Sequence, residues 1–206
     1  MKKNILSCIA IVACLGFANA QDKGNIEFGF NTGLNSSYVA DPHGTSDYST
    51  GFNAGASADF YFSRNWSLKV KAIYDRKGWD HDVIADDRGT LYATNYDVDY
   101  ITVPVMANWH FGYTNNWYIN FGPYVGFMVN AKDTRFDTDV KDMFNKTDVG
   151  LAAGVGVKIP VSNYVKIFLE YDLQGGFTDV FKQDFDNGNN AVNVRNAFNI
   201  GINFML

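Results

Sequence analysis

Nine charged residues occur in segments of alternating polarity, and their spacing could support chemistry. Lys69 and Lys71 are two positions apart, as are Glu170 and Asp172. Residues two apart in a β-strand lie on the same face, so such charges could conduct ions or protons, or could pair. The set holds five acids and four bases: Glu27, Asp59, Lys69, Lys71, Asp75, Lys158, Lys166, Glu170 and Asp172. Because isolated charges are costly in a narrow interior of low dielectric constant, we predict a salt-bridged network.

The polar stretches hold other residues that could bind a metal ion or catalyse a reaction. Asp184, Asp186 and Gly188 resemble part of a calcium loop, but the distal Glu is missing. His43 and His81 lie among Asp and Ser residues. Nothing near them has the spacing of a nucleophile, a base and an orienting group. We therefore predict no catalytic, metal-binding or cofactor-binding residues.

The charged residues must be positioned by eight segments in which apolar and polar residues alternate with a period of two. This period is typical of β-strands. The expected strands are 26–39, 52–62, 66–79, 99–111, 117–131, 149–159, 164–174 and a last one that follows Arg195. Strands of soluble proteins usually have about 5–6 residues, whereas a tilted membrane crossing needs about 9–11. The lengths therefore favour membrane-crossing strands.

The connections between these segments alternate between long and short. The long ones are 40–50, 80–97, 132–147 and the stretch before Arg195, and the short ones are 63–65, 112–116 and 160–163. Outer-membrane barrels have long extracellular loops and short periplasmic turns. We therefore predict an all-β fold, an eight-stranded antiparallel up-and-down transmembrane β-barrel.

The two faces of the strands differ in side-chain size. One carries bulky apolar residues and the other carries mainly Gly, Ala, Ser, Asn and charged residues. A soluble barrel of lipocalin type would need its apolar face inside, where bulky residues from every strand could hardly fit. We expect an aromatic girdle at the short turns, formed by Phe62, Trp66, Trp109, Phe111, Trp117 and Tyr164. Tyr74, Trp79, Tyr100, Tyr171 and Phe177 could form the opposite girdle.

The first 20 residues have the features of a secretory signal peptide. Lys2 and Lys3 precede a short apolar run, and Ala18-Asn19-Ala20 forms an A-x-A exit. We expect residues 1–20 to be cleaved and 21–206 to form the barrel domain, with a lipidated Cys14 as the alternative. The formal net charge of −5 argues against a nucleic-acid partner.

Several motifs resemble the PorT-like family of small outer-membrane β-barrel proteins from Bacteroidota. They are Tyr100-Ile101-Thr102-Val103-Pro104-Val105, Phe121-Gly122-Pro123-Tyr124-Val125-Gly126, the glycine-rich stretch 150–156, and Gly201-Ile202-Asn203-Phe204. The resemblance covers essentially all of residues 21–206 and implies a location but no activity. The end of the chain also resembles the signal that the barrel-assembly machinery reads, through Asn199, Gly201, Phe204 and Leu206. Leu206 departs from that signal, in which Phe is the commonest last residue.

These observations predict a monomeric outer-membrane protein without enzymatic activity. Its lumen would be closed by salt bridges, and its outer loops would bind a partner or support the envelope. Its expected partners are outer-membrane lipid and, during insertion, the barrel-assembly machinery. The alternatives are a lipid-modifying or proteolytic barrel enzyme, a narrow channel for small solutes, and a soluble periplasmic binding barrel.

Overall fold

The computed structural model describes residues 24–41, 44–85, 88–182 and 190–206. The expected signal peptide, with Cys14, lies outside the described residues. The strands are β1 (Ile26–Asp41), β2 (Gly44–Thr45), β3 (Asp47–Tyr61), β4 (Trp66–Ala85), β5 (Leu91–Phe111), β6 (Trp117–Asp133), β7 (Thr147–Pro160), β8 (Val165–Gly176) and β9 (Val192–Met205). The helix among the described residues is the short 3-10 helix η2 (Lys141–Met143). None of the described helical structure is long and apolar enough to cross a membrane.

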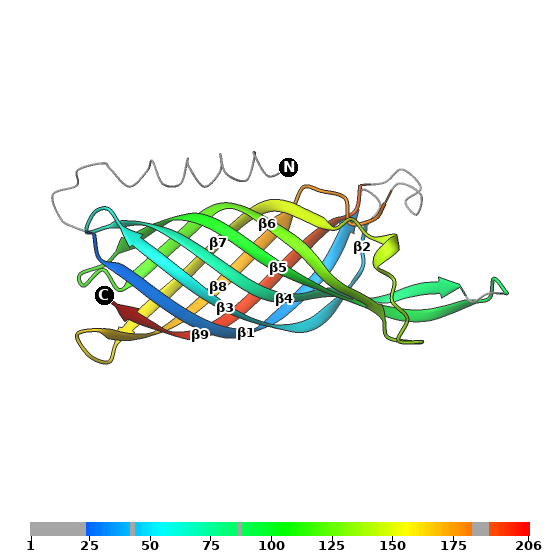
Figure 1. Cartoon of the computed structure of the whole chain (residues 1–206), viewed down its shortest axis with the longest axis horizontal. Coiled ribbons are helices and arrows are strands. Elements are labelled where there is room, and N and C mark those ends of the chain that lie inside the picture. The colour runs from blue at the N-terminus through cyan, green and yellow to red at the C-terminus, as the bar shows by residue number, and fades with distance from the viewer. Residues whose placement is uncertain (1–23, 42–43, 86–87, 183–189) are drawn as a thin grey trace.

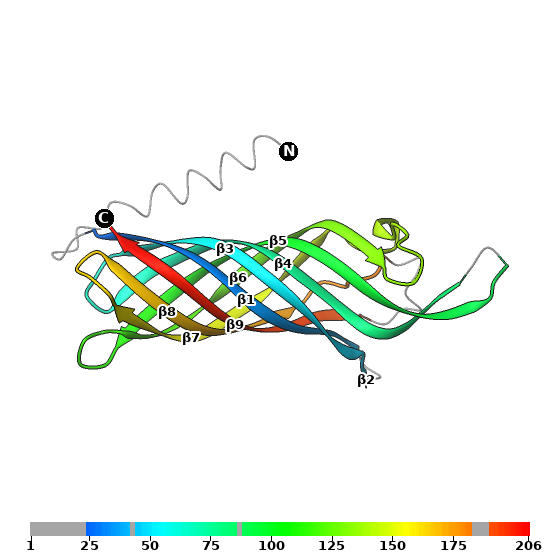
Figure 2. The ribbon, with the colours of Figure 1, turned by 90° about the horizontal axis from the view of Figure 1, so that it is seen from below.

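Eight long strands pair in chain order and close into a ring. Each is antiparallel to its neighbours, and β1 also pairs with β9, from Glu27 opposite Met205 to Ala40 opposite Val192. Figures 1 and 2 show β1 and β9 side by side along this seam. β2 is a two-residue addition to the end of β1. The predicted eight-stranded up-and-down barrel is confirmed.

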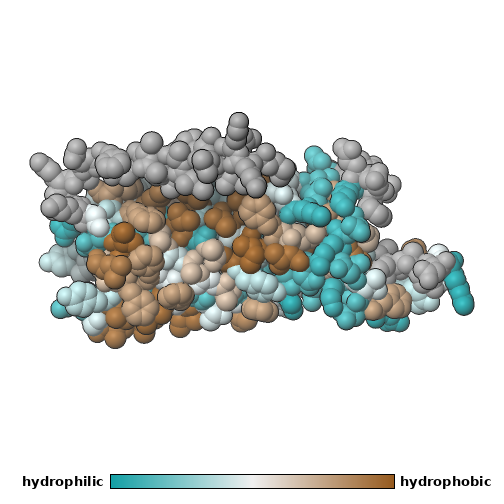
Figure 3. Space-filling view, in the orientation of Figure 1, coloured by the Kyte–Doolittle hydropathy of each residue, from teal (hydrophilic) through white to brown (hydrophobic). Residues whose placement is uncertain are grey.

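The alternation in the sequence places apolar side chains outside the ring and polar ones inside it. Leu34 and Phe198 are 72% and 58% exposed on the outer surface, whereas inward-facing Asn53 and Asn120 are fully buried. Figure 3 shows apolar residues gathered along the barrel wall and hydrophilic ones toward the loop end. Going along that wall from the turn end toward the loop end, the first ion pair joins Arg76 Nε and Asp99 Oδ1, which are 2.8 Å apart. It marks the outer limit of the apolar band, which is about 25 Å tall in such barrels.

The two ends of the barrel differ as predicted. The end that holds the C-terminus has only short connections, after β3, β5 and β7. In the turn after β5, Gly112 and Asn115 have φ angles of +87° and +54°, and glycine and asparagine are the residues that best tolerate this left-handed conformation. The longer connections and the projecting end of the β4–β5 hairpin lie at the opposite end (Figure 1).

Two predicted loops are wrong in extent. The stretch 80–97 lies largely within strands, because β4 continues to Ala85 and β5 begins at Leu91. The stretch 40–50 lies largely in β1, β2 and β3. Both stretches are polar because the strands leave the apolar band there and enter water. Polarity was therefore a poor guide to where the strands end.

Two members of the predicted outer girdle are also misplaced. Trp79 and Tyr100 are only 2% and 1% exposed and face the lumen. Trp79 lies at the same alternate positions as Lys69 and Lys71, so its side chain has to point inward. By contrast, Tyr171 and Phe177 are exposed on the outside, and Tyr74 is partly exposed there.

Candidate functional site

The middle of the lumen is crossed by ion pairs between opposite strands. Strands β4 and β8 are four places apart in the ring of eight, so they face each other across its full width. Lys71 of β4 pairs with Glu170 of β8, and Lys69 Nζ lies 3.4 Å from Glu170 Oε2. Asn120 Nδ2 donates a further hydrogen bond to Glu170, at 3.0 Å. These buried charges are therefore satisfied by partners that span the interior.

Nearer the turn end, Glu27 forms ion pairs with two lysine side chains. Its carboxylate pairs with Lys158, and its Oε2 lies 2.9 Å from Lys166 Nζ. Lys158 also reaches Asp59, whose Oδ2 is 3.3 Å from Lys158 Nζ and 3.6 Å from Lys69 Nζ. Asp59 thus links this group to the middle of the lumen.

Nearer the loop end, Arg195 lies between two acids. Its guanidinium pairs with Asp172, and its Nε lies 2.9 Å from Asp75 Oδ1. Two amides complete the group, because Asn35 donates to Asp75 at 2.7 Å and Asn199 donates to Asp172 at 2.8 Å. The Arg195 side chain is completely buried.

A last ion pair lies still nearer the loop end than these groups. Lys77 Nζ is 2.9 Å from Asp148 Oδ2, and both side chains are almost completely buried. The Lys77 ammonium also lies about 5 Å from the ring centres of Tyr100 and Tyr124, at 5.1 and 4.9 Å, where cation–π attraction applies. Tyr124 donates its hydroxyl to Asp148 at 3.2 Å.

The structure brings all nine predicted charged residues into one connected interior network, and it adds three that sequence reasoning missed. Asp148 raises the number of acids from five to six, and Lys77 and Arg195 raise the bases from four to six. The lumen charges therefore balance. The alternation of inward and outward positions along a strand would have identified all three, since each lies two or four positions from a residue already expected to face inward. Arg195 was missed because the last loop was expected to end there, whereas β9 begins at Val192.

Above the ion pairs, the outer mouth of the barrel is filled by a hydrophobic plug. Its buried members are Val39, Trp79, Tyr96, Val98, Tyr100, Ala131, Val140, Phe144, Val180 and Ala191. Phe144 comes from the long loop after β6 and is fully buried. Its ring centre lies 5.6 Å from that of Trp79 and 5.4 Å from that of Phe181. The sequence did not predict this plug, because a few apolar residues in a polar loop do not reveal that the loop folds inward.

The outer loop after β6 is held in place by a buried carboxylate. Asp133 accepts hydrogen bonds from the backbone N–H groups of Phe136, at 2.7 Å, and Thr138, at 2.8 Å. Burial alone would raise the pKa of Asp133, but these hydrogen bonds outweigh it and lower the pKa. The carboxylate therefore stays ionised and fixes the turn.

The predicted girdle residues lie at the turn end of the barrel. Five of them are exposed on the outside, namely Phe62, Trp66, Trp109, Trp117 and Tyr164, and Phe111 is half-buried. Trp109 stacks on Phe111 with 5.0 Å between the ring centres, and the ring centres of Trp109 and Trp66 are 6.3 Å apart. Aromatic rings in this position suit the boundary between membrane and water.

The four residues of the predicted assembly signal fall on both faces of β9. Asn199 is buried in the lumen, whereas Phe204 is 39% exposed on the outside and Leu206 is 76% exposed beyond the strand. Gly201 faces inward against the Phe168 ring, where a Cβ atom would meet both that ring and the backbone carbonyl of Phe30. Gly201 therefore has a packing role whether or not it is read during assembly.

The interior does not contain a catalytic triad among the described residues. His110 is buried and its Nε2 lies 3.0 Å from Ser67 Oγ, but the Ser67 hydroxyl is also 3.1 Å from Asp59 Oδ1. In a triad the acid orients the histidine, whereas Asp59 here binds the serine. His43 and the stretch 184–188 lie outside the described residues, as does the side chain of His81. The described part of the chain has no cluster of His, Cys, Asp and Glu that could hold a metal ion.

Comparison with known proteins identifies the kind of barrel. Residues 17–182 match the family described as "Outer membrane protein beta-barrel domain". The chain belongs to this family. As a member of it, the barrel resides in the bacterial outer membrane, with its apolar wall against lipid and its short turns toward the periplasm.

Two solved structures with TM-scores of 0.50 or more share the fold of this outer-membrane barrel. Neisserial surface protein A (NspA) matches with a TM-score of 0.53 and 15% identity, over 88% of this chain and 99% of that one. Outer membrane protein AlkL, solved in lipid bilayers, matches with a TM-score of 0.50 and 10% identity, over 92% and 93%. The attachment invasion locus protein Ail of Yersinia pestis matches with a TM-score of 0.44 and 15% identity, over 86% and 98%. No curated protein sequence matches this chain significantly.

Proposed function

We propose that this barrel is a monomeric outer-membrane protein without enzymatic activity, whose lumen is closed to solutes. Its outer loops then either bind a partner outside the cell or support the envelope. The proposal rests above all on the ion pairs that run from Glu27 at the turn end to Asp148 below the hydrophobic plug.

The filling of the lumen supports closure. An eight-stranded barrel is just wide enough for side chains to fill, and here ion pairs join opposite strands while Phe144 and Trp79 close the outer mouth. Moving an ion through this interior would require several buried pairs to open at once. Each opening leaves a charge in a medium of low dielectric constant, which costs several kcal/mol.

A single-channel recording tests closure against the alternative of a narrow channel. The purified protein, inserted into planar lipid bilayers in 1 M KCl, is expected to show no steady conductance above the bare membrane. An open outer-membrane porin, inserted into the same bilayers, is the positive control. A steady ohmic current through the wild-type protein would contradict a closed lumen and support the channel.

The location of the outer loops supports a role outside the cell. The β4–β5 hairpin projects beyond the rest of the barrel at the loop end (Figure 1). Among the described residues, Ser67, His110 and Asp59 do not form a triad, since Asp59 binds Ser67 rather than His110. Measuring lipid A acylation and peptide cleavage in membranes that carry the protein separates the two enzyme alternatives, because turnover of either substrate would refute a non-enzymatic role.

Biogenesis belongs to the same proposal. Residues 1–20 would be removed on export, and the barrel-assembly machinery would read Asn199, Gly201, Phe204 and Leu206. Intact mass distinguishes cleavage after Ala20 from lipidation of Cys14. Within the outer-membrane family, the motifs around Pro104 and Pro123 favour the PorT-like group of Bacteroidota.

A further inference from the structure

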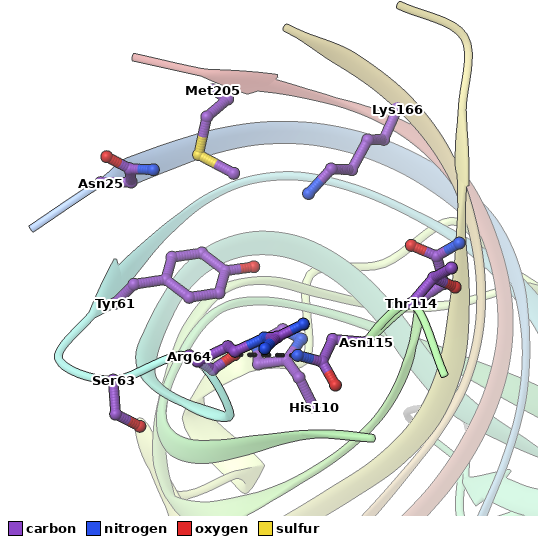
Figure 4. A pocket seen from close by; sticks show the side chains of 10 residues that line it. Asn25, Tyr61, Ser63, Arg64, His110, Thr114, Asn115, Lys166 and Met205 are labelled. Atoms are coloured by element: carbon purple, nitrogen blue, oxygen red, sulfur yellow. Dashed lines mark hydrogen bonds between the residues drawn. The ribbon is translucent and has the colours of Figure 1, made fainter. Parts of the chain in front are cut away.

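A cavity of about 460 Å³ opens at the periplasmic end of the lumen, below the ion pairs. Its size lies within the range of about 300–1,000 Å³ that is usual for sites of small molecules. Tyr61 and Arg64 approach it from the β3 end, Lys166 from β8 and Met205 from β9 (Figure 4). Its ten described lining residues include Arg64, Lys166 and His110, and none of the ten is acidic.

The Tyr61 hydroxyl and the Lys166 ammonium bring hydrogen-bond donors into this cavity. The Tyr61 hydroxyl accepts a hydrogen bond from Lys158 Nζ at 2.9 Å, because an ammonium can only donate. The hydroxyl hydrogen of Tyr61 is therefore left to donate elsewhere. Lys166 has three N–H groups, of which Glu27 takes one, at 2.9 Å. In Figure 4 the tips of Tyr61 and Lys166 both point into the cavity.

Arg64 adds a positive charge that has no acidic partner among the residues that the structure describes. No ion pair joins its guanidinium to an acid in the described part of the chain, in contrast to the lumen, where the acids and bases balance. Its backbone is held in position, because Asn115 Nδ2 donates to the Arg64 carbonyl at 3.4 Å and Asn65 Nδ2 donates to the His110 carbonyl at 2.9 Å. These bonds tie the turn after β3 to the β5–β6 turn.

We propose that this cavity is a binding site for a small organic anion that enters from the periplasm. Carboxylate and phosphate oxygens accept without donating, which matches a cavity lined by Arg64, Lys166 and the Tyr61 hydroxyl. Arg64 would supply a planar guanidinium group, which can donate hydrogen bonds to two such oxygens at once. The site lies on the opposite side of the membrane from the outer loops, so it does not depend on what those loops bind.

Methionine methyl groups provide a direct probe of binding. Met205 lines the cavity, whereas Met106 lies in the barrel core and Met128 and Met143 pack at the outer plug. In the folded protein in detergent, with methionine methyls labelled with ¹³C, inorganic phosphate or glutarate is expected to shift the Met205 signal saturably. The signals of Met106, Met128 and Met143 should stay in place. The probe that binds more tightly shows whether the site prefers a phosphate or a carboxylate group.

Variants separate a built site from general attraction to positive charge. Arg64→Gln is expected to weaken binding about tenfold, and Arg64→Gln with Lys166→Gln to abolish it. The control is Lys132→Gln, which removes one positive charge from an exposed pair at the outer end and should leave the affinity unchanged. Arg64 is exposed in a turn, so its single variant should fold even where the double variant does not.

Three results would overturn the proposal. They are a Met205 signal that neither probe shifts saturably, an affinity that Arg64→Gln leaves unchanged, and an equal loss of affinity in Lys132→Gln.

Discussion

Replacing Phe204 by Asp is expected to abolish assembly of the barrel in cells while leaving refolding in vitro only moderately weakened. Phe204 is on the lipid-facing side of the closing strand β9, where it lies opposite Phe28 of β1 and Val165 of β8. A charge this close to the membrane interface costs only about 0–1 kcal/mol. The complete loss expected in cells is therefore attributed to the removal of a residue of the proposed assembly signal.

Two measurements separate these contributions. Assembly in cells is followed by the altered gel mobility of folded barrels before and after heating, and refolding by urea titration in lipid vesicles. Asn203→Ser is the matched control, one position away but inside the lumen. From the alternation of the sequence alone, Asn203→Asp is expected to be a mild change, because Asn203 takes an inward position. In the structure, however, Asn203 Nδ2 donates to Glu27 Oε1 at 2.8 Å, so Asp would place two carboxylates together. Normal assembly of Phe204→Asp would refute the signal.

The second large effect is expected at the Lys77–Asp148 pair. Lys77→Met leaves the Asp148 carboxylate buried with only neutral hydrogen-bond donors, so it should lower the free energy of unfolding by about 3–5 kcal/mol. Adding Asp148→Asn removes the unpaired charge and should restore most of that loss. Urea unfolding in lipid vesicles of the wild type, the two single variants and the double variant gives the coupling energy between Lys77 and Asp148 directly.

An exposed pair serves as the control for this cycle. Lys132 Nζ lies 2.7 Å from Asp137 Oδ1, and both side chains are well exposed. Surface pairs contribute about 0–1 kcal/mol, so Lys132→Met should change stability little. A cost of Lys77→Met no greater than that of Lys132→Met would mean that water reaches the lumen and that its charges are not held as buried pairs.

The architecture was predictable because strand parity follows from covalent geometry. In β9, Phe198 and Phe204 take the lipid face and Asn199 the lumen, as alternation requires. The same rule located Lys69, Lys71 and Glu170 on the inner face before their partners were known. Pairing across the lumen could not be derived from parity, since it depends on strand order and register. The contact of Lys71 with Glu170 exists because β4 and β8 are opposite in a ring of eight.

Features outside the apolar band were harder to predict. Polarity marks where a strand enters water rather than where it ends, so the extensions of β4 and β5 were read as a loop. The plug depends on loops that turn back into the barrel, and Phe144 carries no local signal that it will pack on Trp79. The periplasmic cavity unites residues from four strands and two turns with Asn25 just before β1, and no short stretch of sequence contains it.

The central claim is that the lumen is filled and inaccessible to solutes, and cysteine labelling tests it most directly. The chain has no cysteine after Cys14, so single cysteines can be introduced into protein produced from residue 21. Thr102 faces the lumen and is completely buried, and its hydroxyl has no hydrogen-bond partner among the described residues, so Thr102→Cys should fold. Tyr113→Cys, at a fully exposed turn position, is the reference.

With a charged, membrane-impermeant thiol reagent applied to the folded protein, Tyr113→Cys should react at once. Thr102→Cys should react only after unfolding. Reaction of folded Thr102→Cys at a rate close to that of Tyr113→Cys would show an open, water-filled lumen and would contradict the account.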